Sequence, residues 1–160
     1  MPTIFPKWPH ILFGIVEPLF LLGGYLTSIF NLYGFIYGQT PQARAPPLSP
    51  RPGLEPSTLA LAYQLANIYL LLFMLGIAVC HTTTEPKVLR HYLIALALAD
   101  LGHLWSTYAA MGWDSFWDFS GWGAIAFGNI AVTGFLFVNR VMYLWGWFGE
   151  AKAPRREKRY

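Results

Sequence analysis

Four apolar stretches, each long enough to cross a lipid bilayer, constrain this chain more than any other feature. They cover residues 11–32, 58–80, 91–110 and 122–147, and about 20 apolar residues suffice for a helix to cross the hydrocarbon core. Of the 160 residues, 55% are hydrophobic and only 12% are charged, against about 25% charged in average proteins. A soluble domain with a charged surface is therefore excluded. We predict one all-α domain over residues 1–160, a four-helix transmembrane bundle.

The basic residues predict how this bundle is oriented. Four spans place both termini on one side, together with the connection between the second and third spans. That side carries eight of the 11 basic residues, whereas the proline-rich loop 38–57 carries two (Lys7, Lys87, Arg90, Lys152, Arg155, Arg156, Lys158 and Arg159 against Arg44 and Arg51). By the positive-inside rule, both termini and the basic tail 148–160 are cytosolic. This clustering follows topology and argues against a nucleic-acid partner. We expect the protein to lie in the membrane of the endoplasmic reticulum, because lipid-modifying membrane proteins often work there.

An acid and a histidine lie in the middle of the third span. Asp100 and His103 are spaced i,i+3, which places both side chains on one helix face. A charge at the centre of a bilayer costs roughly 2.5–3.5 kcal/mol on insertion scales, so such a pair predicts a polar site. Asp100 would orient and charge His103, which would act as an acid or base. A purely structural Asp–His pair is the alternative.

Two further charges lie at matching depths in the first and last spans. Glu17 and Arg140 are each roughly 10 Å from the cytosolic end, at about 1.5 Å per residue. They are predicted to form a buried ion pair that fixes the packing of spans one and four. Alternatively, Arg140 extends its long stem to the headgroups. Glu17 is also a candidate second catalytic acid.

Other polar or aromatic residues inside the spans are candidates for substrate binding. The set is Tyr63, Gln64, Asn67, Trp105, Asn139 and Arg140. In this set, Trp105 can stabilise a developing cation. Gln64 and Asn67 can instead stabilise helix packing through interhelical hydrogen bonds, which average about 0.6 kcal/mol each. Only one histidine lies deep in a span and the chain has one cysteine, so no metal site and no cofactor are expected.

Three motifs together resemble a family of small four-span integral membrane proteins of filamentous fungi. They are Glu17-Pro18 early in span one, the segment Ala97 to His103 in span three, and a tryptophan-rich loop before span four. More distantly, the layout is similar to the emopamil-binding-protein superfamily of sterol isomerases and the sigma-2 receptor. In those isomerases a buried acid and a histidine move protons on a sterol double bond. The resemblance implies such parts for Glu17, Asp100 and His103. Fungal membrane cyclases for terpenoids are another similar class.

These observations predict a membrane-embedded isomerase or cyclase that acts by proton transfer on a hydrophobic sterol- or terpenoid-like small molecule. Its partners would be that ligand and the lipid bilayer, and self-association into a homo-oligomer is an option left open. A non-catalytic lipid-binding or structural protein is the alternative, in which the polar groups only hold the bundle. A proton-coupled transporter would need an oligomer to build a path from so few spans.

Overall fold

The computed structural model describes residues 4–40, 53–149 and 151, and this part of the chain contains helices and no strand. Four helical rods are long and apolar enough to cross a membrane, which confirms the predicted all-α transmembrane bundle. The first rod consists of α1 (Lys7–Ile11), the π-helical turn η1 (Leu12–Val16) and α2 (Glu17–Phe30). The second is α4 (Pro56–Thr82) and the third is α5 (Pro86–Trp117). The fourth consists of α6 (Ala124–Phe127), the π-helical turn η2 (Gly128–Val132) and α7 (Thr133–Leu144).

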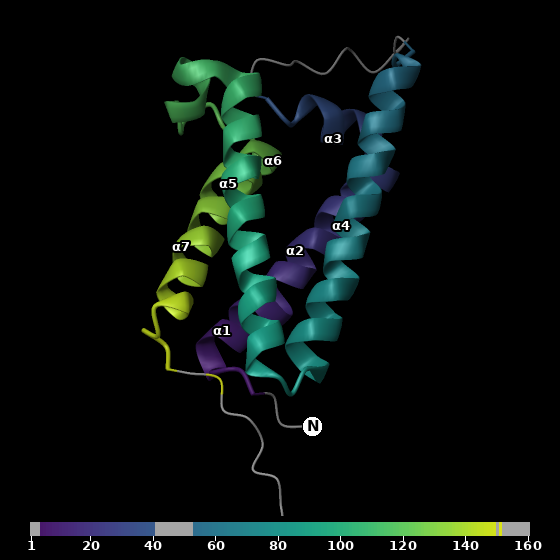
Figure 1. Ribbon diagram of the computed structural model, residues 1–160. Coiled ribbons are helices and arrows are strands. Elements are labelled where there is room, and N and C mark those ends of the chain that lie inside the picture. The colour runs from purple at the N-terminus through teal and green to yellow at the C-terminus, as the bar shows by residue number, and fades with distance from the viewer. Residues whose placement is uncertain (1–3, 41–52, 150, 152–160) are drawn as a thin grey trace, which may run out of the picture.

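The rods alternate in direction, so the beginning of α1, the end of α7 and the short α4–α5 connection lie at one end of the bundle (Figure 1). We call this end the terminal end and the opposite end the loop end. Most of the predicted proline-rich loop and basic tail lie outside the described residues.

The bundle consists of two closely packed pairs of helices. α2 packs along α4, and α5 packs along α7. Small residues on α4, namely Ala62, Ala66 and Gly76, are buried, and small residues let transmembrane helices approach closely. By contrast, α4 and α5 make few contacts with each other, and they diverge from their connection toward the loop end (Figure 1). A space between the two pairs is the consequence.

The first rod changes its hydrogen-bond pattern just before Glu17. In η1 the amide of Glu17 donates to the carbonyl of Leu12, five residues back, and Pro18 has no N–H to donate. Side chains of α4 bind two carbonyls in this region. The Nε2 of His81 lies 2.8 Å from the Gly14 oxygen, and the Cys80 thiol donates to the Phe13 oxygen at 3.6 Å. The terminal end of α4 therefore supports the turn that positions Glu17.

Two short helical segments lie beyond the ends of the predicted spans. Helix α3 (Leu32–Tyr37) follows Asn31, whose side chain accepts a hydrogen bond from the Gly34 amide at 3.1 Å, a helix N-cap. Helical structure also continues past the predicted span end at residue 110, to Trp117. The chain changes direction there at Gly112, whose φ of 74° is readily adopted only by glycine. Both segments cover the loop end of the bundle (Figure 1).

Candidate functional site

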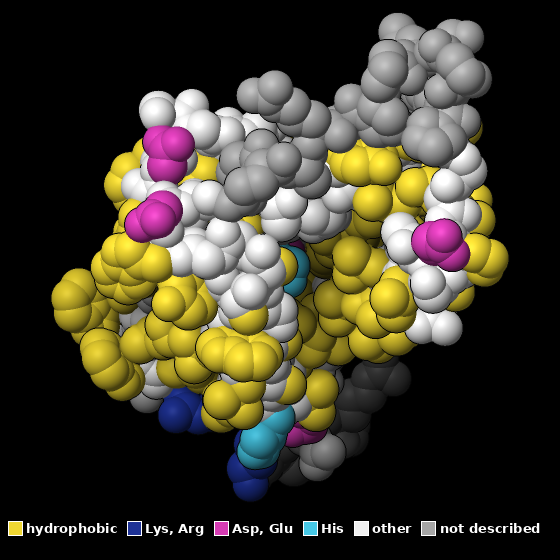
Figure 2. Space-filling view, turned by 90° about the horizontal axis from the view of Figure 1, so that it is seen from above, with side chains coloured by type: hydrophobic (Ala, Val, Ile, Leu, Met, Phe, Trp, Pro, Cys, Tyr) yellow, Lys and Arg dark blue, Asp and Glu magenta, His cyan; other side chains and the backbone are white. Residues whose placement is uncertain are grey.

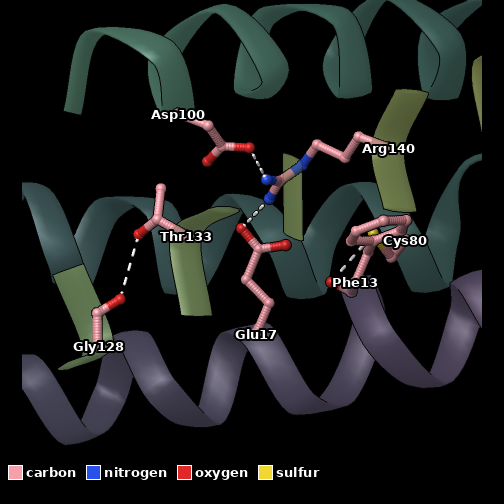
Figure 3. A network of polar contacts seen from close by, with 7 residues as sticks. All are labelled: Phe13, Glu17, Cys80, Asp100, Gly128, Thr133 and Arg140. Carbon is pink, nitrogen blue, oxygen red and sulfur yellow. Dashed lines mark hydrogen bonds and ion pairs between the residues drawn. The ribbon is translucent and has the colours of Figure 1, made fainter. Parts of the chain in front are cut away.

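A fully buried arginine joins three of the four rods. Arg140, on α7, has an exposed fraction of 0%. Its Nη1 donates to Asp100 Oδ2 on α5, and its Nη2 donates to Glu17 Oε1 at the start of α2 (Figure 3). The predicted Glu17–Arg140 ion pair is confirmed, and the alternative in which Arg140 extends to the headgroups is wrong. Arg140 and its two carboxylates are called the charge triad below.

The charge triad contains one more acid than base. Two carboxylates and one guanidinium carry a net charge of −1 when all three are ionised, and a neutral triad holds one extra proton. Glu17 Oε2 and Arg140 Nε are buried without a hydrogen-bond partner in the described part of the chain. The Phe13 ring, whose centroid is 5.1 Å from Arg140 Cζ, packs on the guanidinium, a favourable cation–π contact. The unpartnered Glu17 oxygen is therefore available to carry a proton.

A cavity of about 610 Å³ opens beside the charge triad, between the two helix pairs. Seen from the loop end, the molecule is hollowed between the helices, with hydrophobic side chains around the hollow (Figure 2). Three ionisable residues, Glu17, Asp100 and His103, belong to the wall of this cavity. Much of the remaining wall is apolar and comes from all four rods (for example Phe20, Leu65, Ile68, Leu72, Leu96 and Val132). Such a site is suited to a hydrophobic molecule that meets ionisable groups at one part of its surface.

His103 lines the cavity as predicted, but Asp100 is not its partner. The Asp100 carboxylate binds Arg140, because a charge-assisted hydrogen bond to a guanidinium is stronger than one to a neutral ring. The side chain that interacts with the His103 imidazole is Asn129 of η2. Asn129 in turn donates from Nδ2 to Gln39 Oε1 at 2.8 Å. Both the catalytic and the structural forms of the predicted Asp100–His103 pair are therefore corrected to Asp100–Arg140 and His103–Asn129.

The polar residues predicted on α4 lie outside the cavity. Tyr63, Gln64 and Asn67 are all exposed on the outer surface of the bundle. Leu65 and Leu72 line the cavity, and at about 100° per residue Tyr63 and Asn67 point to the opposite side of the helix. The packing of small α4 residues against α2 sets this rotation.

The other predicted binding residues also lie outside the cavity wall. Trp105 is 70% exposed and does not line the cavity. Asn139 is buried elsewhere, where its Oδ1 accepts from Trp8 Nε1 at 3.0 Å and its Nδ2 donates to the Phe135 carbonyl at 2.9 Å. Arg140 reaches the site only through Glu17 and Asp100. The structure instead adds Tyr69 and Asn129 to the wall. The polarity of Asn129 within span four was the available signal.

No metal centre is evident in the described residues, where no group of three or more histidine, cysteine, aspartate or glutamate side chains could hold an ion.

Comparison with known proteins gives one match. The model of a family described as a domain of unknown function (DUF7704) matches residues 2–150. No curated protein and no solved structure matches the chain.

Proposed function

Since the chain belongs to the DUF7704 family, whose description gives no function, we propose its function from the site itself. The protein is a membrane-embedded isomerase or cyclase that acts by proton transfer on a hydrophobic sterol- or terpenoid-like molecule. The observation that carries this proposal is the composition of the cavity wall. It is largely apolar, yet it includes Glu17, Asp100 and His103 at one site inside a membrane bundle.

The proton donor in this proposal is the charge triad. Burial in a bilayer disfavours the net charge of −1, so the triad retains one proton, shared between Glu17 and Asp100. A carbon–carbon double bond placed against this acid takes up the proton with its π electrons, which leaves a carbocation on the adjacent carbon. The carboxylate that remains is stabilised by the hydrogen bonds from Arg140. Arg140 is therefore a positioning residue, and the two carboxyl groups do the chemistry.

The proton acceptor in this proposal is His103. It is one helical turn from Asp100, and side chains at i and i+3 have Cβ atoms about 5–6 Å apart, so both reach neighbouring carbons of one ligand. Loss of a C–H proton from the cation to a neutral imidazole gives a shifted double bond, which is an isomerisation. Attack of a second double bond on the cation before that loss gives a ring. Return of the proton from His103 to the triad restores the starting state.

The hydrophobic substrate in this proposal comes from the bilayer. The α4–α5 contact is sparse, and both helices contribute residues to the cavity wall, among them Ile68 and Ala99. Ala99 is also exposed at the surface, as a residue at an opening would be. A molecule dissolved in lipid can enter between these helices without crossing water.

A non-catalytic lipid-binding protein is the second candidate, and one observation favours it. Arg140 binds α2 and α5 from α7, so the charge triad alone would hold three rods together. In that reading the cavity stores or presents a lipid and the triad has only a structural task. The isomerase proposal differs from this one because it requires His103 and the spare proton of the triad to convert the ligand chemically.

We further propose that the protein lies in the endoplasmic reticulum with both termini in the cytosol. The excess of basic residues on the terminal side supports the orientation. The four apolar helices support integration into a membrane. The similarity in layout to the emopamil-binding-protein superfamily supports the substrate class, and the compartment is proposed because lipid-modifying membrane proteins often work there.

Metabolite profiling of cells that lack the gene tests the proposed function. Neutral lipids are compared after restoring the wild-type protein, the His103→Gln variant or the His91→Gln variant. His91 is exposed and lies on the same helix, so it is a matched control for the same substitution. We expect one hydrophobic compound to accumulate in the deletion strain and to be consumed with wild type and His91→Gln only. An unchanged lipid profile in the deletion strain, or full restoration by a folded His103→Gln variant, would contradict the proposal.

A further inference from the structure

The outer face of α4 carries a regular stripe that nothing in the described structure covers. Its six members recur at alternating spacings of four and three residues, and all are exposed (Ala60, Gln64, Asn67, Leu71, Met74 and Ala78). Alternating spacings of three and four are those of the contact positions in a pair of supercoiled helices. We call these six residues the α4 stripe. It lies nearly opposite the small residues that pack on α2, at about 100° per residue.

The α4 stripe contains amide side chains where a bilayer has no hydrogen-bonding groups. Asn67 lies roughly 17 Å from Pro56 and roughly 23 Å from Thr82 along the helix, at about 1.5 Å per residue. Those distances place it well inside a hydrocarbon core of about 30 Å. Asn67 is exposed, and so is Gln64 less than one turn away. Polar side chains in such positions almost always face protein or water rather than lipid.

We propose that a second copy of this chain covers the α4 stripe, so that the protein is a dimer in the membrane. Two copies insert with the same orientation, so their α4 helices run parallel in a two-fold arrangement and each stripe residue meets its own counterpart. An amide both donates and accepts hydrogen bonds, so Asn67 is complementary to Asn67 of the other copy. This self-complementarity favours a second copy of the chain as the occupant.

The remaining stripe residues fit this occupant. Ala60 and Ala78 at the two ends allow close backbone approach, while Leu71 and Met74 supply apolar contact area. The stripe faces away from the cavity-lining residues Leu65 and Leu72, at about 100° per residue, although the cavity-lining Ile68 is only about 40° from Gln64 around the helix. The dimer proposal rests on this outer face and not on the proposed chemistry.

Disulfide crosslinking in phosphatidylcholine vesicles tests which face associates. The full-length Met74→Cys protein is oxidised with copper phenanthroline and compared with the unmodified chain, whose only cysteine, Cys80, is buried. The Leu98→Cys protein is the control for a lipid-facing site, since Leu98 is 65% exposed on α5. We expect a covalent dimer with Met74→Cys and little with either control. Equal crosslinking at Leu98→Cys, or none at Met74→Cys, would overturn the proposal.

Energy transfer between labelled copies, followed as the vesicles are diluted with lipid, measures the strength of association. Asn67→Leu removes the amide and increases compatibility with lipid, so the variant should still insert and fold. We expect its dimer dissociation constant to be roughly 3- to 30-fold weaker, the range that one or two interhelical hydrogen bonds give. Ser106→Ala, which alters an exposed polar residue of α5, should leave it unchanged. A monomeric wild-type protein at every dilution, or an unaffected Asn67→Leu dimer, would refute the proposed interface.

Discussion

Asp100 forms its ion pair with Arg140, 40 positions further along the chain, and not with the histidine one turn away on its own helix. This contact links α5 to α7, and the second Nη of the same guanidinium links α7 to α2. One buried cation thus binds two acids, and His103 is left as a separate group on the cavity wall.

The stoichiometry of the charge triad predicts an unusual pattern of stabilities. Glu17→Gln alone leaves a balanced Asp100–Arg140 pair, so it should lower the free energy of unfolding by less than about 1 kcal/mol. Arg140→Met leaves two buried acids without a cation, and Glu17→Gln with Asp100→Asn leaves the cation alone. Each of these two changes should lower the free energy of unfolding by about 3–5 kcal/mol, as removal of one partner of a buried ion pair does. The triple variant should recover most of the wild-type stability.

The single cysteine supplies the measurement. Cys80 is buried, so a thiol-reactive fluorophore added during a thermal ramp reports unfolding in detergent. Glu85→Gln, which alters an exposed acid outside the triad, is the control for Glu17→Gln. If Glu17→Gln destabilises the protein as strongly as Arg140→Met, the triad does not hold a spare acid.

The histidine at the terminal end of α4 should be coupled to the proline of span one. Pro18 cannot donate to the Gly14 carbonyl, and the Nε2 of His81 is 2.8 Å from that oxygen. His81→Phe should therefore cost about 0.5–1.5 kcal/mol, the net contribution of one hydrogen bond. In a Pro18→Ala background, which restores a backbone donor, the same substitution should cost less. Equal costs in both backgrounds, measured by thermal unfolding, would show that the two residues are not coupled.

Filling the cavity should prevent ligand binding while the fold is kept. Ala99 lines the cavity and borders the surface, so Ala99→Phe places a ring in the opening without displacing a buried residue. Ala109→Phe makes the same change at an exposed position of α5 outside the cavity wall. Native mass spectrometry should detect a co-purified hydrophobic molecule with the wild type and Ala109→Phe, and much less with Ala99→Phe. Equal occupancy in all three proteins would show that the ligand binds elsewhere.

Reporter fusions test the proposed orientation. A reporter at either terminus should give a cytosolic signal, whereas one inserted at Gly53, just before α4, should give a lumenal signal. The reason is the uneven distribution of lysine and arginine between the two sides. A lumenal signal from the C-terminus would reverse the orientation of the whole bundle.

The sequence predicts the spans well because membrane insertion depends on local hydropathy and length. It also predicts the Glu17–Arg140 pair, since matched depth and opposite charge leave few alternatives. The choice of Arg140 over His103 by Asp100 was not predictable from spacing. Spacing identifies residues that share one face of one helix. The competing partner, Arg140, lies on another helix and reaches Asp100 with its long side chain.

The prediction of which face of α4 points into the bundle was wrong for a related reason. Tyr63, Gln64 and Asn67 were interpreted as facing inward because they are polar, although helix rotation is set by packing. The buried Ala62 and Ala66, four residues apart, were the signal for the face that packs on α2.

Solvent deuterium incorporation tests the central claim most directly. The protein is reconstituted in phosphatidylcholine nanodiscs with the neutral lipid extract of cells that lack the gene, in D₂O buffer, and products are followed by mass spectrometry. Proton transfer to carbon by the charge triad predicts a product that carries deuterium in a C–H position with wild type and with His91→Gln. Rates with Glu17→Gln and His103→Gln should fall about 10²–10⁴-fold, the usual contribution of general acid–base catalysis. If no lipid gains deuterium with the wild-type protein, or if both folded variants label it at the wild-type rate, this site does not catalyse proton transfer.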